Sequence, residues 1–254
     1  MKFLLVTDLH YTDKPWGSNN RYHEKSLDKV RTAIESYSEG CEFIACLGDI
    51  VDSYEGCKPQ EQGLREIREM LDGFDIDFYP TFGNHDTSLD KHEFMRLIGM
   101  SDRYYSFETD EYLCLMLDSC MNSKSEPYPQ KEIIWTDCYI DDEQLDWMKD
   151  KISHSDKPVV VMTHAILSGD EDHTINNADE IKDILLEYEE KIAAVFCGHY
   201  HDGLHSKISS IPYVVFKALC MGEAFTCAVV EITTDSVKIT GYGDEPSIQI
   251  KKEK

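Results

Sequence analysis

The sequence predicts an α/β fold in which two mixed β-sheets pack between helical layers, an αββα arrangement. Short apolar runs alternate with amphipathic helical patterns from the N-terminus to about residue 203, and only strand patterns follow. No internal repeat, low-complexity segment or linker divides the 254 residues. We therefore expect one domain spanning residues 1–254.

The first third of the chain reads as three strand–helix units. Residues 2–6 (KFLLV) form a short apolar run, and residues 25–37 carry Leu27, Val30 and Ile34 at the three-to-four spacing of a buried helix face. The elements expected next are strand 42–47, helix 61–71, strand 77–82 and helix 89–99, where Gly99 suits a left-handed helix end.

The rest of the chain changes from strand–helix units to strands alone. The elements expected in order are strands 104–108 and 112–118, helix 141–152 with an acidic first turn, strand 157–163, helix 178–190, strand 193–197, and strands 212–219, 225–232 and 236–242. Residues 119–140 and 165–177 show no clean period and adjoin strand ends. Long loops in compact domains are usually functional, so we expect these two to wall a crevice.

Charge and cysteine content restrict the partners and the compartment. A formal net charge of −24 disfavours long nucleic acids and anionic membrane surfaces, whereas a small anionic substrate remains compatible if cations occupy the site. Nine cysteines, an odd number without a C-x-x-C pair, indicate free thiols in a reducing compartment. No apolar run reaches membrane-span length, so we expect a cytoplasmic protein. The sequence gives no indication of oligomeric state.

Five predicted strands end in side chains that can bind metals. In chain order these strands run into Asp8 and His10, Asp49, Asn84 and His85, His164, and His199 and His201. Because ligand crevices of open α/β sheets form at the carboxyl ends of the strands, we expect these side chains to converge.

The donor chemistry of this group predicts a metal centre. Carboxylate, amide and imidazole donors suit Mn²⁺, Fe or Zn²⁺. Without His85 the group still offers seven donors, which is too many for one ion. Two divalent ions about 3.5–4 Å apart, bridged by one carboxylate, match the set and the needs of phosphoryl chemistry. Any single one of these residues could instead cap a loop or helix.

The motifs D-x-H, G-D, G-N-H-D, H and G-H-x-H, in that order, resemble the calcineurin-like metallophosphoesterase superfamily over residues 3–203. The resemblance implies a dinuclear centre and in-line attack of a metal-bound hydroxide on phosphorus. It assigns Asp8, His10, Asp49 and His201 to one ion, and Asp49, Asn84, His164 and His199 to the other, with Asp49 bridging.

The same resemblance assigns the leaving-group chemistry. His85, from G-N-H-D, would stabilise or protonate the leaving oxygen, and Asp52, three residues after the bridging aspartate, would orient His85. Of the histidines outside the motifs, His205 is expected beside the ligands together with Asp202. Arg21 would reach the substrate or cap a solvated helix entry.

A narrower resemblance concerns the substrate. The stretches NRYHEKSLDKVRTAIE and VKITGYGDEPS are similar to manganese-dependent ADP-ribose/CDP-alcohol diphosphatases. This implies hydrolysis of a small phosphodiester or of the pyrophosphate bond of a nucleotide-derived substrate, with Mn²⁺ as the expected ion. The alternatives are a cyclic-nucleotide phosphodiesterase, a phosphomonoesterase, or a metal-free protein-interaction scaffold on the same fold.

Overall fold

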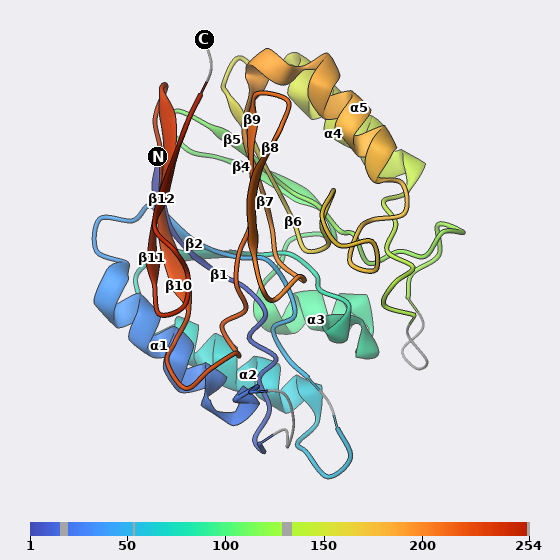
Figure 1. Cartoon of the computed structure of the whole chain (residues 1–254). Helices are drawn as coiled ribbons and strands as arrows, with labels where there is room; N and C mark the ends of the chain where they lie inside the picture. The colour runs from blue at the N-terminus through green and yellow to red at the C-terminus, as the bar shows by residue number, and fades with distance from the viewer. Residues whose placement is uncertain (16–19, 53, 129–133, 253–254) are drawn as a thin grey trace.

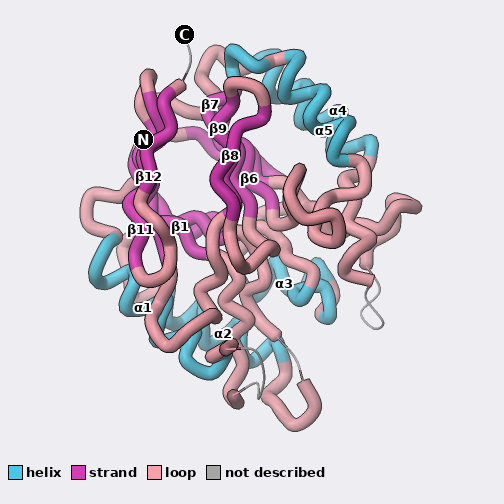
Figure 2. The backbone as a smooth tube through the Cα atoms, viewed as in Figure 1, coloured by secondary structure: helices cyan, strands magenta, loops and turns pink. Residues whose placement is uncertain are grey.

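Two six-stranded sheets packed face to face form the centre of the molecule, and helices cover both outer sides (Figure 1). The computed structural model describes residues 1–15, 20–52, 54–128 and 134–252. Figure 2 shows the strands gathered between the helical layers, with long loops below and beside them. The predicted α/β fold with two mixed sheets is therefore confirmed.

The first sheet has the strand order β12-β11-β10-β1-β2-β3. Its strands are β1 (Lys2–Val6), β2 (Phe43–Cys46), β3 (Asp77–Pro80), β10 (Cys227–Ile232), β11 (Ser236–Tyr242) and β12 (Ile248–Lys251). β1, β2 and β3 are parallel, whereas β10 joins β1 antiparallel and β11 and β12 continue as an antiparallel meander. The C-terminal strands thus extend a parallel unit built by the N-terminal third.

The second sheet has the strand order β4-β5-β6-β7-β9-β8. Its strands are β4 (Tyr105–Glu108), β5 (Leu113–Met116), β6 (Val159–Thr163), β7 (Ile192–Cys197), β8 (Leu204–Ile208) and β9 (Ile211–Val215). The four inner strands are parallel to one another, and the edge strands β4 and β8 are antiparallel. The carboxyl ends of β5, β6, β7 and β9 therefore meet at one edge.

Five α-helices occupy the described part of the chain: α1 (Ser26–Tyr37), α2 (Gln60–Leu71), α3 (Lys91–Ile98), α4 (Asp142–His154) and α5 (Ala178–Glu187). Short 3-10 turns η1 (His23–Lys25), η2 (His85–Ser88) and η3 (Glu189–Lys191) accompany them. α3 ends at Gly99 with φ 82°, the predicted left-handed position. α4 begins at Asp141, whose side chain accepts the N–H of Gln144 at 2.9 Å. None of these helices combines the length and apolarity that crossing a membrane requires.

Alternation along the strands creates two apolar layers. Phe3 and Leu5 of β1 belong to the core between the sheets, where Phe3 stacks on Phe43 with ring centroids 4.7 Å apart. Leu4 and Val6 point to the other face and belong to the core shared with the helices. Because both faces of β1 are buried, the residues that alternate between the two faces are all apolar, and the strand appears in the sequence as a continuous apolar run.

Two strands escape the sequence prediction, and several of the predicted strands are shorter than expected. β8 (LHSKI) and β12 (IQIK) lie at sheet edges, where exposed polar positions dilute the strand pattern. β9 ends at Val215, four residues before the expected boundary of strand 212–219. Residues 216–219 instead cross to the loop after β1, where the N–H of Leu219 donates to the carbonyl of Thr7 at 2.9 Å.

Candidate dinuclear metal centre

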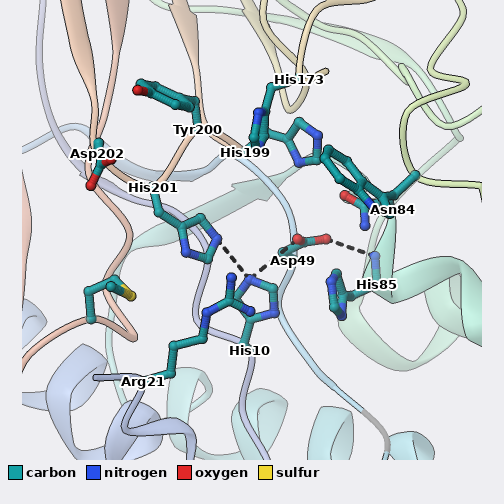
Figure 3. Close-up of a pocket in the computed structure, with 12 residues that line it drawn as sticks. His10, Arg21, Asp49, Asn84, His85, His173, His199, Tyr200, His201 and Asp202 are labelled. Atoms are coloured by element: carbon teal, nitrogen blue, oxygen red, sulfur yellow. Dashed lines mark hydrogen bonds and ion pairs between the residues drawn. The ribbon is translucent and has the colours of Figure 1, made fainter. Parts of the chain in front are cut away.

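The carboxyl ends of β1, β2, β3, β6 and β7 converge, and the side chains that follow them surround one cavity of about 570 Å³ (Figure 3). His10, Asp49, Asn84, His85, His199 and His201 line this cavity. Asp8 and His164 are fully buried beside them. The structure therefore brings together all the residues that the strand-end motifs singled out.

Four of these residues adopt a left-handed backbone conformation. The φ angles are 53° at Asp8, 47° at His10, 51° at Asp49 and 66° at His199. Residues other than glycine rarely adopt such angles, and they persist where surrounding structure holds them at a functional site. Asp8 and His10 follow β1, Asp49 follows β2 and His199 follows β7, so the chain turns sharply just after each of these three strands. The turns direct these side chains towards the cavity.

Two glycines of the motifs allow the loops to approach closely. A Cβ on Gly83 would collide with the carboxylate and backbone of Asp49, and a Cβ on Gly198 would collide with Thr7 and Asp8. G-N-H-D and G-H-x-H therefore require glycine because another loop passes directly against their backbone.

Asp49 lies at the centre of the group. Its Oδ2 is 3.4 Å from Nε2 of His10 and 3.4 Å from Nε2 of His164, so one carboxylate oxygen faces two imidazoles from two different sheets. Its Oδ1 accepts the backbone N–H of His85 at 2.9 Å (Figure 3). This is the placement that a bridging carboxylate needs.

Polar atoms without partners test whether a metal fits. Among the described residues, the buried Nε2 of His199 has no hydrogen-bond partner, and the buried Oδ1 of Asp8 makes no hydrogen bond although the imidazole of His201 is close to it. Burying such atoms is unfavourable unless something satisfies them. Asp8 Oδ1 lies 3.3 Å from Nε2 of His201, and Asn84 Oδ1 lies 3.2 Å from Nε2 of His164. The oxygen and nitrogen donors fit hard or borderline divalent ions.

The charges of the site depend on one another. Burial alone would raise the pKa of Asp49, but His164, His85 and His10 outweigh it and hold that pKa well below its ordinary value. Burial alone would lower the pKa of His164, but Asp49 and Asp8 outweigh it and raise the pKa to about 9. Burial and neighbouring His164 lower the pKa of His199. Without cations, the carboxylates therefore retain protons on some of the imidazoles.

Asp52 connects two imidazoles. Its Oδ1 accepts from Nδ1 of His85 at 2.7 Å, and its Oδ2 accepts from Nδ1 of His10 at 3.0 Å. Burial would raise the pKa of Asp52, but these two hydrogen bonds outweigh it and keep the carboxyl ionised. Tyr54 donates to Oδ2 of Asp52, and its hydroxyl lies 2.8 Å from Nδ1 of His23. Because Asp52 holds the Nδ1 atoms of His85 and His10, the Nε2 atoms of these two histidines are left to face the cavity.

Several residues of the cavity carried no recognisable signal in the sequence. Trp135 and His173, from the two expected wall loops, form an aromatic wall with Tyr200. The Trp135–His173 centroids are 5.0 Å apart, and the His173–Tyr200 centroids are 5.3 Å apart. Met221 also lines the cavity, as does Arg21, which the sequence had already offered as a substrate contact. Residues 129–133 of loop 119–140 lie outside the described residues.

Asp202 and His205, which were both expected beside the metal ligands, lie in different surroundings. Asp202 lines the cavity, whereas His205 is not among the described residues that line it, and its Nε2 pairs with buried Glu245 at 3.2 Å. Glu245 also accepts the N–H of Lys217 at 2.8 Å, so this pair joins the turn after β11 to the end of β9. Of the other histidines outside the motifs, His92 and His154 are exposed, His23 is buried beside Asp52 and Tyr54, and His173 lines the cavity.

Comparisons with known proteins agree with this geometry. The family described as calcineurin-like phosphoesterase matches residues 1–203. A manganese-dependent ADP-ribose/CDP-alcohol diphosphatase from Homo sapiens is 21% identical over 322 aligned residues, covering 99% of this chain and 93% of the relative. A serine/threonine-protein phosphatase, CPPED1 from Mus musculus, is 28% identical, covering 80% of this chain and 66% of the relative.

The fold also matches a solved structure along its whole length. The crystal structure of a dimetal phosphatase from Danio rerio superposes with a TM-score of 0.85 at 18% identity, covering 99% of each chain. At this identity the likeness concerns the fold alone.

Proposed function

The chain belongs to the calcineurin-like phosphoesterase family, and we propose that this metal-dependent phosphoric ester hydrolase acts on a small, nucleotide-derived substrate. The bond broken would be a phosphodiester or a pyrophosphate bond of the ADP-ribose or CDP-alcohol type. The observation that carries the proposal is the cavity itself, where the donor cluster around Asp49 faces an aromatic wall and a single arginine across about 570 Å³. That volume suits a ligand of nucleotide size.

We assign the donors to two ions. Asp8, His10, Asp49 and His201 would hold one, and Asp49, Asn84, His164 and His199 the other. The distances of Asp49 to His10 and His164 support its bridging role. Mn²⁺ is the proposed ion, because the relative from Homo sapiens is named as manganese-dependent and these oxygen and nitrogen donors accept it.

Bound divalent ions would supply Lewis acidity and an activated water for attack on phosphorus. The chain's own residues would do the rest. His85, one-third exposed to the cavity, would give a proton from Nε2 to the leaving oxygen, while Asp52 holds its Nδ1–H. Asp52 would likewise keep Nε2 of His10 facing the ions.

The walls of the cavity supply features of substrate selection. Trp135, His173 and Tyr200 present ring faces and edges on which a nucleobase can stack. Arg21 is the one lysine or arginine among the described residues that line the cavity, and its fork suits a phosphate oxygen pair. The net charge of −24 repels a long polyanion, whereas a small ester enters the locally cationic centre.

The cysteines support a location for this activity. All nine are free, and seven of them are buried. Free buried thiols are typical of reducing compartments, so we propose the cytoplasm.

The test compares substrates on metal-stripped protein resupplied with Mn²⁺. ADP-ribose, CDP-choline, cyclic AMP and bis-p-nitrophenyl phosphate would be assayed with wild type, Asp49→Asn and the exposed-histidine control His92→Gln. We expect ADP-ribose or CDP-choline to be cleaved at least about tenfold better than cyclic AMP, with Asp49→Asn inactive and His92→Gln unaffected.

Each other outcome has a definite meaning. Preference for cyclic AMP would replace the substrate class with cyclic nucleotides. Turnover of the activated diester alone would overturn the nucleotide-derived substrate while leaving the hydrolase. Equal behaviour of Asp49→Asn and wild type would contradict the metal assignment.

A further inference from the structure

A sixth strand ends at the metal-binding edge and delivers a thiol there. β9 is parallel to β7, so its carboxyl end lies at the same edge as that of β7, which leads to His199 and His201. The chain after β9 reaches Cys220. A nitrogen of His10, a nitrogen of His201 and Sγ of Cys220 all lie within 4.8 Å of one another. None of the strand-end motifs includes this cysteine.

The backbone around Cys220 is held in place. Its N–H donates to the carbonyl of Asp8 at 3.1 Å, and its carbonyl accepts from the N–H of Tyr22 at 2.8 Å. Buried Lys29 also donates from Nζ to the carbonyl of Cys220 at 3.2 Å and to that of Gly222 at 2.8 Å. The thiol is therefore presented by a fixed segment tied to the loop that carries Asp8.

The rings beside the thiol already face a shared point. Nε2 of His10 and Nε2 of His201 are 3.2 Å apart, as the dashed line in Figure 3 marks. Metal–nitrogen bonds of about 2.0–2.1 Å and metal–sulfur bonds of about 2.3 Å place donors on opposite sides of an ion roughly 4.4 Å apart. All three atoms lie within 4.8 Å of one another, and neighbouring nitrogen and sulfur donors of a tetrahedral ion lie roughly 3.6 Å apart, so a side-chain rotation of up to about 1 Å brings the sulfur to the ion.

We propose that Cys220 is an additional donor to the ion at His10 and His201, and that it strengthens the intrinsic preference of this position for Zn²⁺ or Co²⁺ over Mn²⁺. The inference rests on the metal centre of the proposed function. On binding, the Cys220 thiol loses its proton to solvent and its sulfur bonds to the metal. Thiolate donors select softer ions than carboxylates and imidazoles do, so the two positions of the centre differ in preference.

Cobalt spectroscopy tests the sulfur bond directly. Metal-stripped wild type, Cys220→Ser, Cys220→Ala and the control Cys41→Ser would each be titrated with Co²⁺. Cys41 is half-buried in the turn between α1 and β2 and belongs to none of the candidate metal clusters among the described residues. We expect a near-ultraviolet sulfur-to-cobalt charge-transfer band in wild type and Cys41→Ser, and its loss in both Cys220 variants while the visible cobalt bands remain.

The outcomes separate this inference from the proposed function. Visible cobalt bands in wild type without the charge-transfer band, or a band that survives in Cys220→Ser, would overturn the role of Cys220 and leave the metal centre standing. Wild type that binds no cobalt would overturn both.

A competition experiment measures the metal preference. Protein equilibrated with Zn²⁺ and Mn²⁺ together would be desalted and its metals counted. We expect the Zn²⁺ preference of wild type and Cys41→Ser to fall by about tenfold or more at one of the two positions in Cys220→Ser. An unchanged ratio would contradict the inference.

Discussion

Four of the proposed metal-binding residues have a strained backbone conformation that hydrogen bonds from neighbouring loops stabilise. Asp8, His10, Asp49 and His199 are all left-handed, and backbone hydrogen bonds hold the turns: the N–H of Asp8 donates to the carbonyl of Gly48 at 3.1 Å. The N–H of His10 donates to the carbonyl of Asp49 at 2.8 Å. The loops after β1 and β2 thus stabilise each other, and their strained residues are the ones proposed to bind metal.

The proposed role of His85, proton donation to the leaving oxygen, can be tested by comparing substrates whose leaving groups differ in basicity. Replacing His85 with Asn removes the proton donor, so hydrolysis of cyclic AMP, whose leaving group is an alkoxide, should slow by about a hundredfold or more. Hydrolysis of bis-p-nitrophenyl phosphate should slow far less, because p-nitrophenolate leaves without a proton. The measurement is kcat for both substrates, with His92→Gln as the control. An equal loss on both substrates would assign His85 to binding or structure instead.

His164 makes metal binding depend on pH. The pKa of His164 in the metal-free site is about 9, above the ordinary value of 6.5. At pH 8 the imidazole is therefore mostly protonated, and it must lose this proton to bind a metal ion. Titration of Mn²⁺ at pH 8 in buffers of different ionisation enthalpy should show release of roughly one to two protons. Heats that do not depend on the buffer would contradict this charge state.

The same shift sets the pH dependence of the metal-free protein. A folded-state pKa raised above the unfolded one contributes stability that is present below about pH 6.5 and is lost as pH rises through about 9. The Tm in chelator should therefore fall over this range, and the gain in Tm on adding Mn²⁺ should grow.

At the scale of elements, one buried carboxylate joins two motif loops. Asp86 accepts the N–H of Ile50 at 2.8 Å, that of Val51 at 3.2 Å and that of Gly83 at 2.9 Å. G-D and G-N-H-D are therefore one structural unit, although 34 positions separate Asp49 from Gly83. The final aspartate of G-N-H-D serves this junction and does not line the cavity among the described residues.

Replacing Asp86 with Ala would leave three buried N–H groups without an acceptor. We expect the free energy of unfolding to fall by on the order of 3 kcal/mol, and Asp86→Asn to lose less because its amide oxygen still accepts. Urea unfolding of the metal-free proteins measures both, against the exposed-surface control Asp156→Asn. A change no larger than that of the control would show that solvent or a rearranged loop replaces Asp86.

The whole molecule depends on the apolar layer between its two sheets. Phe3 and Phe43 from the first sheet meet Phe196 from the second, with Phe3 and Phe196 centroids 6.0 Å apart. The proposed metal donors divide between the same two sheets: Asp8, His10, Asp49 and Asn84 follow the first, and His164, His199 and His201 follow the second. Sheet packing and metal binding are therefore expected to be coupled.

This coupling predicts one cooperative unit over residues 1–254. Calorimetry should show a single unfolding transition, and Mn²⁺ should raise its Tm without splitting it, because the ions bind only the assembled sheets. Two transitions, of which only one responds to Mn²⁺, would show that the sheets unfold separately and would contradict the single-domain proposal.

Much of the fold and of the candidate site could be predicted from local pattern. The buried strands are short apolar runs, and the polar side chains that follow them had to lie at one edge because parallel strands end together. The edge strands β8 and β12 were missed because half of their residues face solvent, so their sequences carry little apolar signal.

The sequence by itself therefore determined the α/β class, the strand-end donors around Asp49 and their chemistry, since these depend on periodicity and on residues adjacent to each strand. Only the tertiary structure decided that Trp135, His173 and Arg21 share one cavity and that Cys220 lies beside His10 and His201. Those contacts depend on sheet order and on the paths of loops between distant segments. No local pattern encodes such paths, because each is chosen by the packing of the whole chain.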